Sequence, residues 1–316
     1  MRALITGAGG FVGGHLCAFL MDHTDWEILG TVYPRPQESS EPCPRMRLVF
    51  ADLRNPQMVE ELIVDWEPGV IIHLAALSSV SASFEHPWET LENNIRAQLN
   101  ILEAVRQAGT PTRVLVIGSN EEYGKPGEDQ LPITEETPLR PQSPYAVSKV
   151  TQDVLGLQYH LAYGIEVVRL RPFNHTGPGQ SPRFVVPAFA SQIARIEAGL
   201  QEPVLSVGNL KVWRDFTDVR DMVRAYFLAA TKAEPGEAYN LASGRPQSIR
   251  GMLESLLALS TVDIQVEVDP DRYRPADMPL AYGSAAKFHQ RTGWKPEIAF
   301  EQTLQDVLAY WRKEVG

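Results

Sequence analysis

The sequence has little cysteine and lacks any long apolar run. Only two of its 316 residues are cysteine, Cys17 and Cys43, and their spacing fits neither a metal site nor a redox motif. Such usage suits a reducing compartment, so we expect a cytoplasmic protein without a bound metal. No apolar stretch approaches the length that spans a membrane. Glycines interrupt the apolar stretch at the N-terminus, which argues against a signal peptide.

The sequence also lacks a basic block, which excludes two classes of partner. The net charge is −10, and Lys and Arg do not cluster. Nucleic acid and anionic membranes are therefore not expected as partners. A small anionic ligand stays open, because a local pair of arginines can hold a phosphate on an acidic protein. With 44% hydrophobic residues, the chain can form a large core in one or two domains.

Strand and helix patterns alternate through the first half of the chain. The expected strands are apolar at almost every position and cover 2–6, 27–32, 47–51, 70–75, 113–118 and 166–170. The expected helices between them cover 10–21, 56–65, 88–108 and 144–163. Strands of this kind are buried on both faces. The pattern therefore predicts an α/β fold with a doubly wound parallel (Rossmann) sheet.

The composition changes after Arg171, where RPFNHTGPGQSPRF predicts a long loop. Short strands and helices follow and are expected at 204–207, 264–268, 186–199, 248–259 and 300–312. They indicate a smaller mixed α/β lobe that binds the substrate, formed by about 173–214 and 246–316. The dinucleotide-binding domain would comprise 1–172 and about 215–245.

A glycine-rich turn joins the first expected strand to the first helix. Gly7 would make the tight turn, Gly10 would let the backbone approach a pyrophosphate, and Gly13 would let the helix pack close to the strand. Phe11 and Val12 would lie at the helix N-terminus, which is a natural anion site. The spacing G-x-x-G-x-x-G differs by one residue from G-x-G-x-x-G, and its place between strand and helix predicts a dinucleotide site.

The end of the second strand indicates which dinucleotide binds. It reads GTVYPRP and lacks the carboxylate that would bind a ribose 2′-hydroxyl. Arg35 lies nearby, and an arginine can pair with a 2′-phosphate. NADP(H) is therefore favoured, with NAD(H) as the alternative if Arg35 is only a solvated loop residue.

The stretch SPYAVSK carries a second functional pattern. Tyr145 and Lys149 lie four residues apart on one face of an expected helix, which Ser143 would cap. A neighbouring ammonium favours the phenolate, so Lys149 is expected to lower the pKa of Tyr145 from about 10. Ser119 ends the fifth strand, at the sheet edge where such folds bind ligands. The three side chains suit proton and hydride transfer. The alternative is that they are a surface tyrosine, a solvated lysine and a serine that caps a turn.

Longer motifs give the chain a resemblance to a known family. These motifs are TGAGGFVGGHL, ADLRNP, IIHLAALSSV, NNIRAQLNIL, IGSNEEYG, SPYAVSK and RPFNHTGPGQ. The chain resembles the extended short-chain dehydrogenase/reductases over essentially its whole length. Within them it is most similar to the reductases of GDP-linked 4-keto-6-deoxymannose, through GSNEEYG, RPFNHTGPGQSPRFV, VGNLKVWRDFTDVRD, RPADMPL and TGWKPEI.

The resemblance implies roles for particular residues. Tyr145 would protonate the substrate carbonyl, Lys149 would also bind the nicotinamide ribose, and Ser119 would orient the carbonyl. The implied cofactor contacts, at the adenine end and beside the nicotinamide, are Asp52, Leu53, Leu74, Ala75 and Ala76. The implied substrate contacts are Ser78, Ser79, Glu121, Asn174, Asn209, Arg214 and Arg274.

Two of these implied contacts are arginines, and guanidinium groups can bind phosphate oxygens bidentately. Arg214 and Arg274 would therefore hold the nucleotide diphosphate. Arg214 could instead pair with Asp215 or Asp218, and Ser78 and Ser79 could simply cap the helix that follows.

The resemblance implies NADP(H)-dependent reduction of the 4-keto group of GDP-4-keto-6-deoxy-D-mannose to GDP-D-rhamnose. The alternative is a GDP-mannose 4,6-dehydratase or another nucleotide-sugar epimerase or dehydratase. Glu121 occupies the place of the dehydratase base, whereas GAGGFVGGHL departs from the dehydratase pattern GxTGQDGxYL. The family also implies a homodimer, for which Val150, Val154, Leu157 and Leu161 offer an apolar stripe. That stripe could instead pack on its own sheet.

Overall fold

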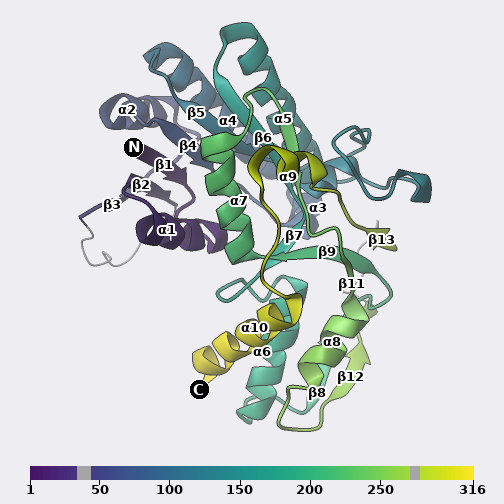
Figure 1. Ribbon diagram of the computed structural model, residues 1–316. Coiled ribbons are helices and arrows are strands. Elements are labelled where there is room, and N and C mark those ends of the chain that lie inside the picture. Colours follow the sequence, from purple (N-terminus) through teal and green to yellow (C-terminus); the bar gives the residue numbers. More distant parts are fainter. Residues whose placement is uncertain (34–43, 271–277) are drawn as a thin grey trace.

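The computed structural model describes residues 1–33, 44–270 and 278–316, so Arg35, Cys43 and Arg274 lie outside the described residues. Its centre is a seven-stranded sheet of order β10-β6-β5-β4-β1-β2-β3 (Figure 1). The strands are β1 (Arg2–Thr6), β2 (Glu27–Val32), β3 (Met46–Phe50), β4 (Val70–His73), β5 (Arg113–Ile117), β6 (Glu166–Pro172) and β10 (Ala238–Leu241). All neighbouring strands are parallel, which confirms the predicted doubly wound fold.

Helices cover both faces of the sheet (Figure 1). Successive strand residues point to opposite faces. Ile5 therefore packs in one core with α1 (Phe11–His23) and α7 (Val219–Lys232). Leu4 packs in the other core, with α2 (Pro56–Trp66), α4 (Pro87–Ala108) and α5 (Pro144–Tyr163). The strand order reverses between β1 and β4, and sheets of this kind bind ligands at such a switch point.

A smaller lobe packs beside the sheet (Figure 1). Its core lies among α6 (Val185–Glu197), α8 (Ile249–Leu257) and α10 (Phe300–Val315). The strands β8 (Val204–Val207) and β12 (Gln265–Val268) form a parallel pair here. A second small sheet contains β11 (Pro246–Ser248), β9 (Trp213–Asp218) and β13 (Leu280–Ala281). The remaining elements are α3 (Val80–Glu85), the 3-10 turns η1 (Asn120–Tyr123) and η2 (Glu128–Gln130), and α9 (Ala286–Thr292).

Two features differ from the sequence-based expectations. The expected loop after Arg171 contains a strand, β7 (Asn174–Thr176), which pairs with β9. A strand of three residues is too short to show a period in the sequence. Phe288 and Trp294, expected in the second lobe, pack in the core beside α7. The boundaries of the two lobes otherwise stay a prediction. Within the described ranges, no helix combines the length and apolarity needed to cross a bilayer.

Candidate functional site

The glycine turn lies between β1 and α1, at the switch point of the sheet. Gly7 has a φ of 70°, and a Cβ there would lie 3.0 Å from the Ala75 amide nitrogen. Gly10 donates a 2.9 Å hydrogen bond to the Gly7 carbonyl and is the N-cap residue of α1, where it provides no side-chain hydrogen bond. No side chain of the N-cap residue therefore accepts a hydrogen bond from the N–H groups at the start of α1, where Phe11 and Val12 lie. This backbone cradle fits a diphosphate group.

The segment after β4 closes the turn from the other side. Leu74, Ala75 and Ala76 follow β4 and are half-buried. The Ala75 amide donates to the Thr6 hydroxyl at 3.1 Å, and that hydroxyl lies 2.9 Å from Nδ1 of His73. The ends of β1 and β4 are thus tied together. The structure places the predicted nicotinamide-side segment directly against the glycine turn.

The predicted adenine-side residues follow β3. Leu53 is buried in the core, and Asp52 forms an ion pair of 2.7 Å with Arg54. The side-chain hydrogen bond from Arg54 holds the pKa of the Asp52 carboxyl below its usual range. The Arg54 guanidinium also lies over the Tyr33 ring, 5.6 Å from its centroid, just after β2. Arg54 is not predicted from the sequence, although it directly follows the Asp-Leu pair.

Ser119, Tyr145 and Lys149 come together at the carboxyl end of β5. Ser143 caps α5 by accepting the Ala146 amide at 3.1 Å, which places Tyr145 in the first turn of that helix. Lys149, one turn later, donates to the Ile117 carbonyl at 2.8 Å, and Nζ lies 5.9 Å from the centroid of the Tyr145 ring. The Ser119 hydroxyl interacts with Tyr145 and also caps η1. All three side chains are buried.

Burial sets the pKa values of these groups. It raises the pKa of Tyr145 above its ordinary value, whereas the hydrogen bond with Ser119 acts in the lowering direction. It lowers the pKa of Lys149 to about 8. The structure therefore differs from the expectation that Lys149 lowers the pKa of Tyr145, because desolvation outweighs what the chain's own groups supply. The positive charge of an oxidised nicotinamide would act in the lowering direction.

Several residues that are predicted to bind the substrate line the larger described cavity, whose volume is about 500 Å³. Glu121, Asn174, Asn209 and Arg214 line it. Arg214 donates to the carbonyls of Trp213 and Met278, at 2.8 and 2.5 Å. Its two suggested partners are engaged elsewhere. Asp215 accepts hydrogen bonds from residues 243, 244 and 283, and Asp218 pairs with Arg220 at 2.8 Å.

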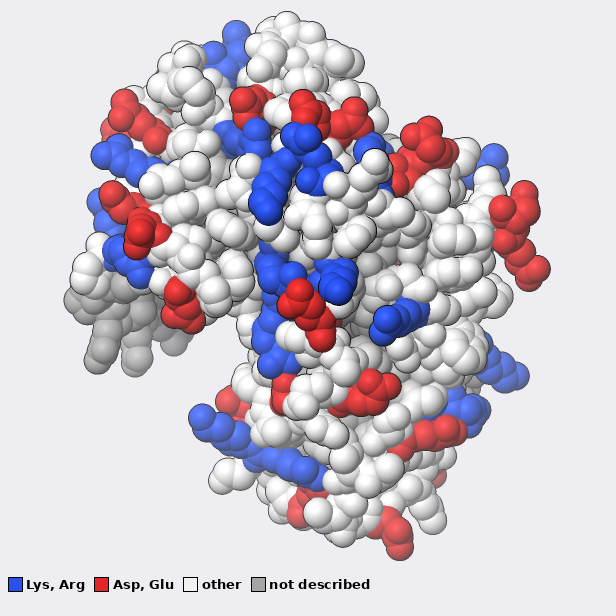
Figure 2. All heavy atoms as spheres, viewed as in Figure 1, with Lys and Arg blue, Asp and Glu red and all other residues white. Residues whose placement is uncertain are grey.

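Two predicted contacts do not reach this cavity. Ser79 caps α3 by accepting the Ala82 amide at 3.2 Å, and Ser81 lines the cavity in place of Ser78 and Ser79. The sequence analysis missed two cationic lining residues, Lys125 and Arg183. Arg183 lies within the stretch RPFNHTGPGQSPRF, which predicts a long loop but gives no sign that this arginine lines a cavity. On the face that Figure 2 draws, basic side chains follow one another over α7 and down to the junction with the smaller lobe, although the protein is acidic.

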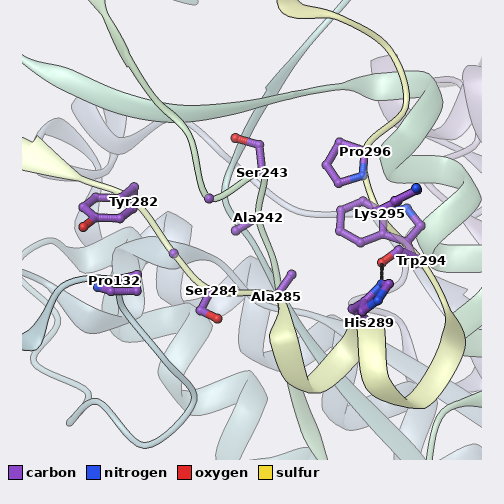
Figure 3. A pocket seen from close by; sticks show the side chains of 12 residues that line it. Pro132, Ala242, Ser243, Tyr282, Ser284, Ala285, His289, Trp294, Lys295 and Pro296 are labelled. Atoms are coloured by element: carbon purple, nitrogen blue, oxygen red, sulfur yellow. Dashed lines mark hydrogen bonds between the residues drawn. The ribbon is translucent and has the colours of Figure 1, made fainter.

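A second cavity, with a volume of about 280 Å³, is lined by none of the residues that are predicted to form the site. Ser243 and Tyr282 line one side of it, and His289 and Trp294 line the other (Figure 3). His289 is held in place by a 2.9 Å hydrogen bond between Nδ1 and the Trp294 carbonyl. None of the predicted catalytic, cofactor or substrate residues lines this cavity.

The switch-point cradle and the buried Ser–Tyr–Lys group define the class of protein. The chain is an extended short-chain dehydrogenase/reductase, with the nucleotide cradle of a doubly wound α/β fold. It belongs to the GDP-mannose 4,6 dehydratase family, whose model matches residues 4–307. The resemblance stated from the motifs is therefore confirmed.

Known proteins similar to the chain include both reductases and dehydratases. The GDP-6-deoxy-D-mannose reductase of Pseudomonas aeruginosa is 39% identical over 99% of this chain and 98% of its own. GDP-mannose 4,6 dehydratase 2 of Arabidopsis thaliana is 30% identical over 97% of this chain and 85% of its own. The solved structure of RMD from Pseudomonas aeruginosa complexed with NADPH is 38% identical, covers 99% of both chains and has a TM-score of 0.88.

Proposed function

We propose that this protein reduces the 4-keto group of GDP-4-keto-6-deoxy-D-mannose with NADPH, forming GDP-D-rhamnose. One observation carries the proposal: Ser119, Tyr145 and Lys149 meet beside a cavity that Arg214 and Arg183 line. A proton donor thus lies next to a site with cationic groups for a diphosphate. The likeness to the Pseudomonas aeruginosa GDP-6-deoxy-D-mannose reductase supports the same substrate class.

The chain's own residues provide positioning and proton transfer. The glycine turn would hold NADPH, whose chemistry would be to supply a hydride for the ketone carbon. Tyr145 gives its proton to the oxygen of the same carbonyl, and the Ser119 hydroxyl donates a hydrogen bond to that oxygen. Lys149 fixes the nicotinamide ribose and contributes positive charge beside the tyrosine. A raised Tyr145 pKa suits this direction of reaction, because the phenol must carry its proton before reduction.

NADP(H) is the favoured cofactor, and NAD(H) is the alternative. Arg54, over Tyr33 at the end of β2, is the described residue best placed to meet a 2′-phosphate. Its guanidinium is already oriented by Asp52 through bonds of 2.9 and 2.7 Å. The likeness to a structure complexed with NADPH supports this choice.

The test of the proposed function is direct. The purified protein is incubated with GDP-4-keto-6-deoxy-D-mannose and each reduced cofactor, and NADPH or NADH consumption is followed by absorbance. The product is then identified by NMR. GDP-D-rhamnose formed with NADPH is the expected result. The proposal is wrong if neither cofactor is consumed, or if the sugar is released with its ketone intact.

Dehydration of GDP-mannose is a second candidate, because Glu121 lines the cavity next to Ser119. A carboxylate there is suited to removing a proton beside a ketone. The two functions separate in one variant, Glu121→Gln. If the protein is the reductase, this variant keeps most of its NADPH-dependent turnover. If the protein is the dehydratase, GDP-mannose is converted by the unmodified chain and not by the variant.

We further propose that the protein is a homodimer in the cytoplasm. On α5, Val154 is 52% exposed and Leu161 is 74% exposed, and Val147 on the same helix is also exposed. The apolar stripe therefore faces outward, and a second copy packed against α4 and α5 would cover it. Cys17 is a free, buried thiol whose pKa burial raises to about 11, in keeping with a reducing compartment.

A further inference from the structure

Glu122 is a buried carboxyl group directly behind the proposed site. It is fully buried in η1, and its Oε1 accepts a 2.7 Å hydrogen bond from the amide of Ser119. A Cβ on Gly118 would clash with this oxygen, so the glycine at the end of β5 leaves the room that the carboxyl occupies. The neighbouring Glu121 lines the substrate cavity, whereas Glu122 does not. Consecutive glutamates therefore point into different environments.

The charged groups around Glu122 come from two other elements. From β6, Nε of Arg171 lies 3.4 Å from its Oε2. From α5, Asp153 forms ion pairs with Arg171 at 2.9 Å and with Arg169 at 2.7 Å. The hydrogen bonds of Arg171 go to Asp153, to the Tyr123 hydroxyl and to the Glu135 carbonyl, and Oε2 of Glu122 has no hydrogen-bond partner among the described residues. The positive charge of Arg171 is thus shared unequally between the two carboxylates.

Lys149 is the other buried cation near Glu122: its Nζ donates to the carbonyl of Ile117, and the Glu122 carboxyl group lies against the next residue, Gly118. Burial lowers the pKa of this ammonium to about 8, and the negative charge of Glu122 acts in the opposite direction. His73, on β4, also faces Lys149, but burial and the lysine lower the His73 pKa to about 3, so the imidazole is neutral at working pH. Tyr145 is uncharged while it holds its proton. Among these described neighbours of Lys149, only Glu122 can bring a negative charge, which it does when its carboxyl group ionises.

The reverse influence is also present. Burial and Asp153 raise the pKa of Glu122 to about 8, while Arg171 and Lys149 lower it. The two buried groups, one acidic and one basic, therefore titrate in the same pH range and each favours the charged form of the other. Groups that interact in this way titrate as a pair.

We propose that Glu122 is a positioning residue of the site: its Oε1 holds the Ser119 amide, and its carboxyl group, when ionised, is the buried counter-charge of the Lys149 ammonium. The proposal rests on the proposed function only where it treats Ser119 and Lys149 as catalytic residues. Glu122 itself touches neither substrate nor cofactor. It acts through the residue that orients the ketone and through the residue that supplies positive charge beside Tyr145.

The variant that tests the charge is Glu122→Gln, whose amide oxygen can still accept the Ser119 N–H. Loss of the negative charge should lower the Lys149 pKa by about one unit or more. An NMR titration of lysine labelled with ¹³C at Cε measures this shift in the folded protein without substrate. The high-pH limb of kcat should move down by the same amount, because turnover needs the ammonium form. An unchanged Lys149 titration would overturn the proposal.

A reciprocal variant protects the test if Glu122→Gln does not fold. In Lys149→Met, loss of the positive charge should raise the Glu122 pKa above about 8, measured from its ¹³C-labelled carboxyl group. A Glu122 titration that does not move would overturn the proposal as well. These measurements are independent of turnover. If the coupling is found and the keto sugar is not reduced, the proposed function alone fails.

The matched control is Asp221→Asn. Asp221 is a buried carboxylate on α7 that accepts the Glu297 and Ile298 amides, each at 2.9 Å, and it lies outside the proposed site. The substitution should lower the stability of the fold and leave the Lys149 titration and the high-pH limb where they are. A shift of Lys149 in this control equal to that in Glu122→Gln would show that general destabilisation is the cause, and would overturn the assignment.

Discussion

A Cβ atom on Gly13 would lie 2.7 Å from the Cα atom of Ala8 and closer still to the carbonyl oxygen of Gly7. α1 therefore packs against the turn after β1 with no space for a side chain. One residue further along, a Cβ on Gly14 would meet no atom within 4 Å. The same helix thus contains one glycine that the cradle requires and one that it does not.

This pair makes a first prediction. Gly13→Ala should force α1 away from the turn and reduce the free energy of unfolding by about 1–3 kcal/mol, the usual range for overpacking. It should also weaken NADPH binding, because the N-terminus of α1 would move. Gly14→Ala should be neutral or stabilising by about 0.5–1 kcal/mol, since alanine favours a helix interior. Urea denaturation and NADPH fluorescence titration measure both effects. Equal stability of the two variants would contradict the role given to Gly13.

The second prediction concerns the proton donor. Tyr145→Phe should lower kcat by about 10²–10⁴-fold, because the variant retains the ring and loses the acid. NADPH affinity should change little, since the phenol is not expected to hold the phosphates. Tyr163→Phe, at the exposed end of the same helix, is the control and should keep full turnover. Unchanged kcat in Tyr145→Phe would remove the central residue of the proposed mechanism.

The third prediction tests Arg54. Arg54→Gln should weaken NADPH binding about tenfold or more, because a hydrogen bond to a charged group contributes about 1.5–3 kcal/mol. NADH binding should change little, as NADH has no 2′-phosphate. Arg47→Gln, on β3 and next to Trp66, should weaken neither cofactor. The two dissociation constants come from fluorescence titrations. A parallel loss for both cofactors would show that Arg54 only supports the fold here.

Much of the sheet and the cradle could be predicted from local sequence. The strands of the sheet are nearly continuous apolar runs. A run such as Arg2–Thr6 that leads directly into glycines indicates a buried strand followed by a tight turn. Strand ends are not defined by the apolar pattern: the sequence predicts a strand over 70–75, and β4 ends at His73. The apolar letters continue past the last ladder partner, so hydropathy alone does not show where the pairing stops.

The features that sequence missed depend on contacts between distant segments. β7 exists because residues 174–176 lie against β9, some forty residues away, and nothing local requires a strand there. Arg54 is significant because Tyr33 lies beneath it. Glu122 reads as one more acidic letter next to Glu121, and only the fold shows that one faces the cavity and the other is buried against Arg171.

The fourth prediction tests the proposed dimer. Leu161→Asp should turn the dimer into a monomer, because a carboxylate would have to lose its hydration on burial against a second copy. Val64→Asp, at an exposed valine of α2, should leave the dimer intact. Light scattering after gel filtration gives the mass of each form. If the unmodified protein is monomeric at every concentration tested, or if Leu161→Asp stays dimeric, the outward apolar stripe does not form the interface.

The last prediction is a pH dependence in the smaller lobe. Arg312 on α10 donates to both carboxylate oxygens of Glu197 on α6, at 2.7 and 2.8 Å, and also to the Leu259 carbonyl. The hydrogen bond from Arg312 holds the pKa of Glu197 below its ordinary value. The folded pKa thus lies below the unfolded one. The stabilisation is therefore complete above about pH 4.3, the usual Glu value, and is lost as the pH falls through the folded pKa.

Arg312→Gln should reduce the free energy of unfolding at pH 7 by about 0.5–1 kcal/mol, a modest figure because the guanidinium is partly exposed and screened. The difference from the unmodified protein should shrink as Glu197 becomes protonated in acid, and also at high salt. Lys313→Gln, at the next position of α10, is the control and should show no such dependence. Urea denaturation across the acid range provides the measurement. A difference that stays constant with pH would mean that Arg312 stabilises the lobe through the Leu259 carbonyl and packing, and not through the charge of Glu197.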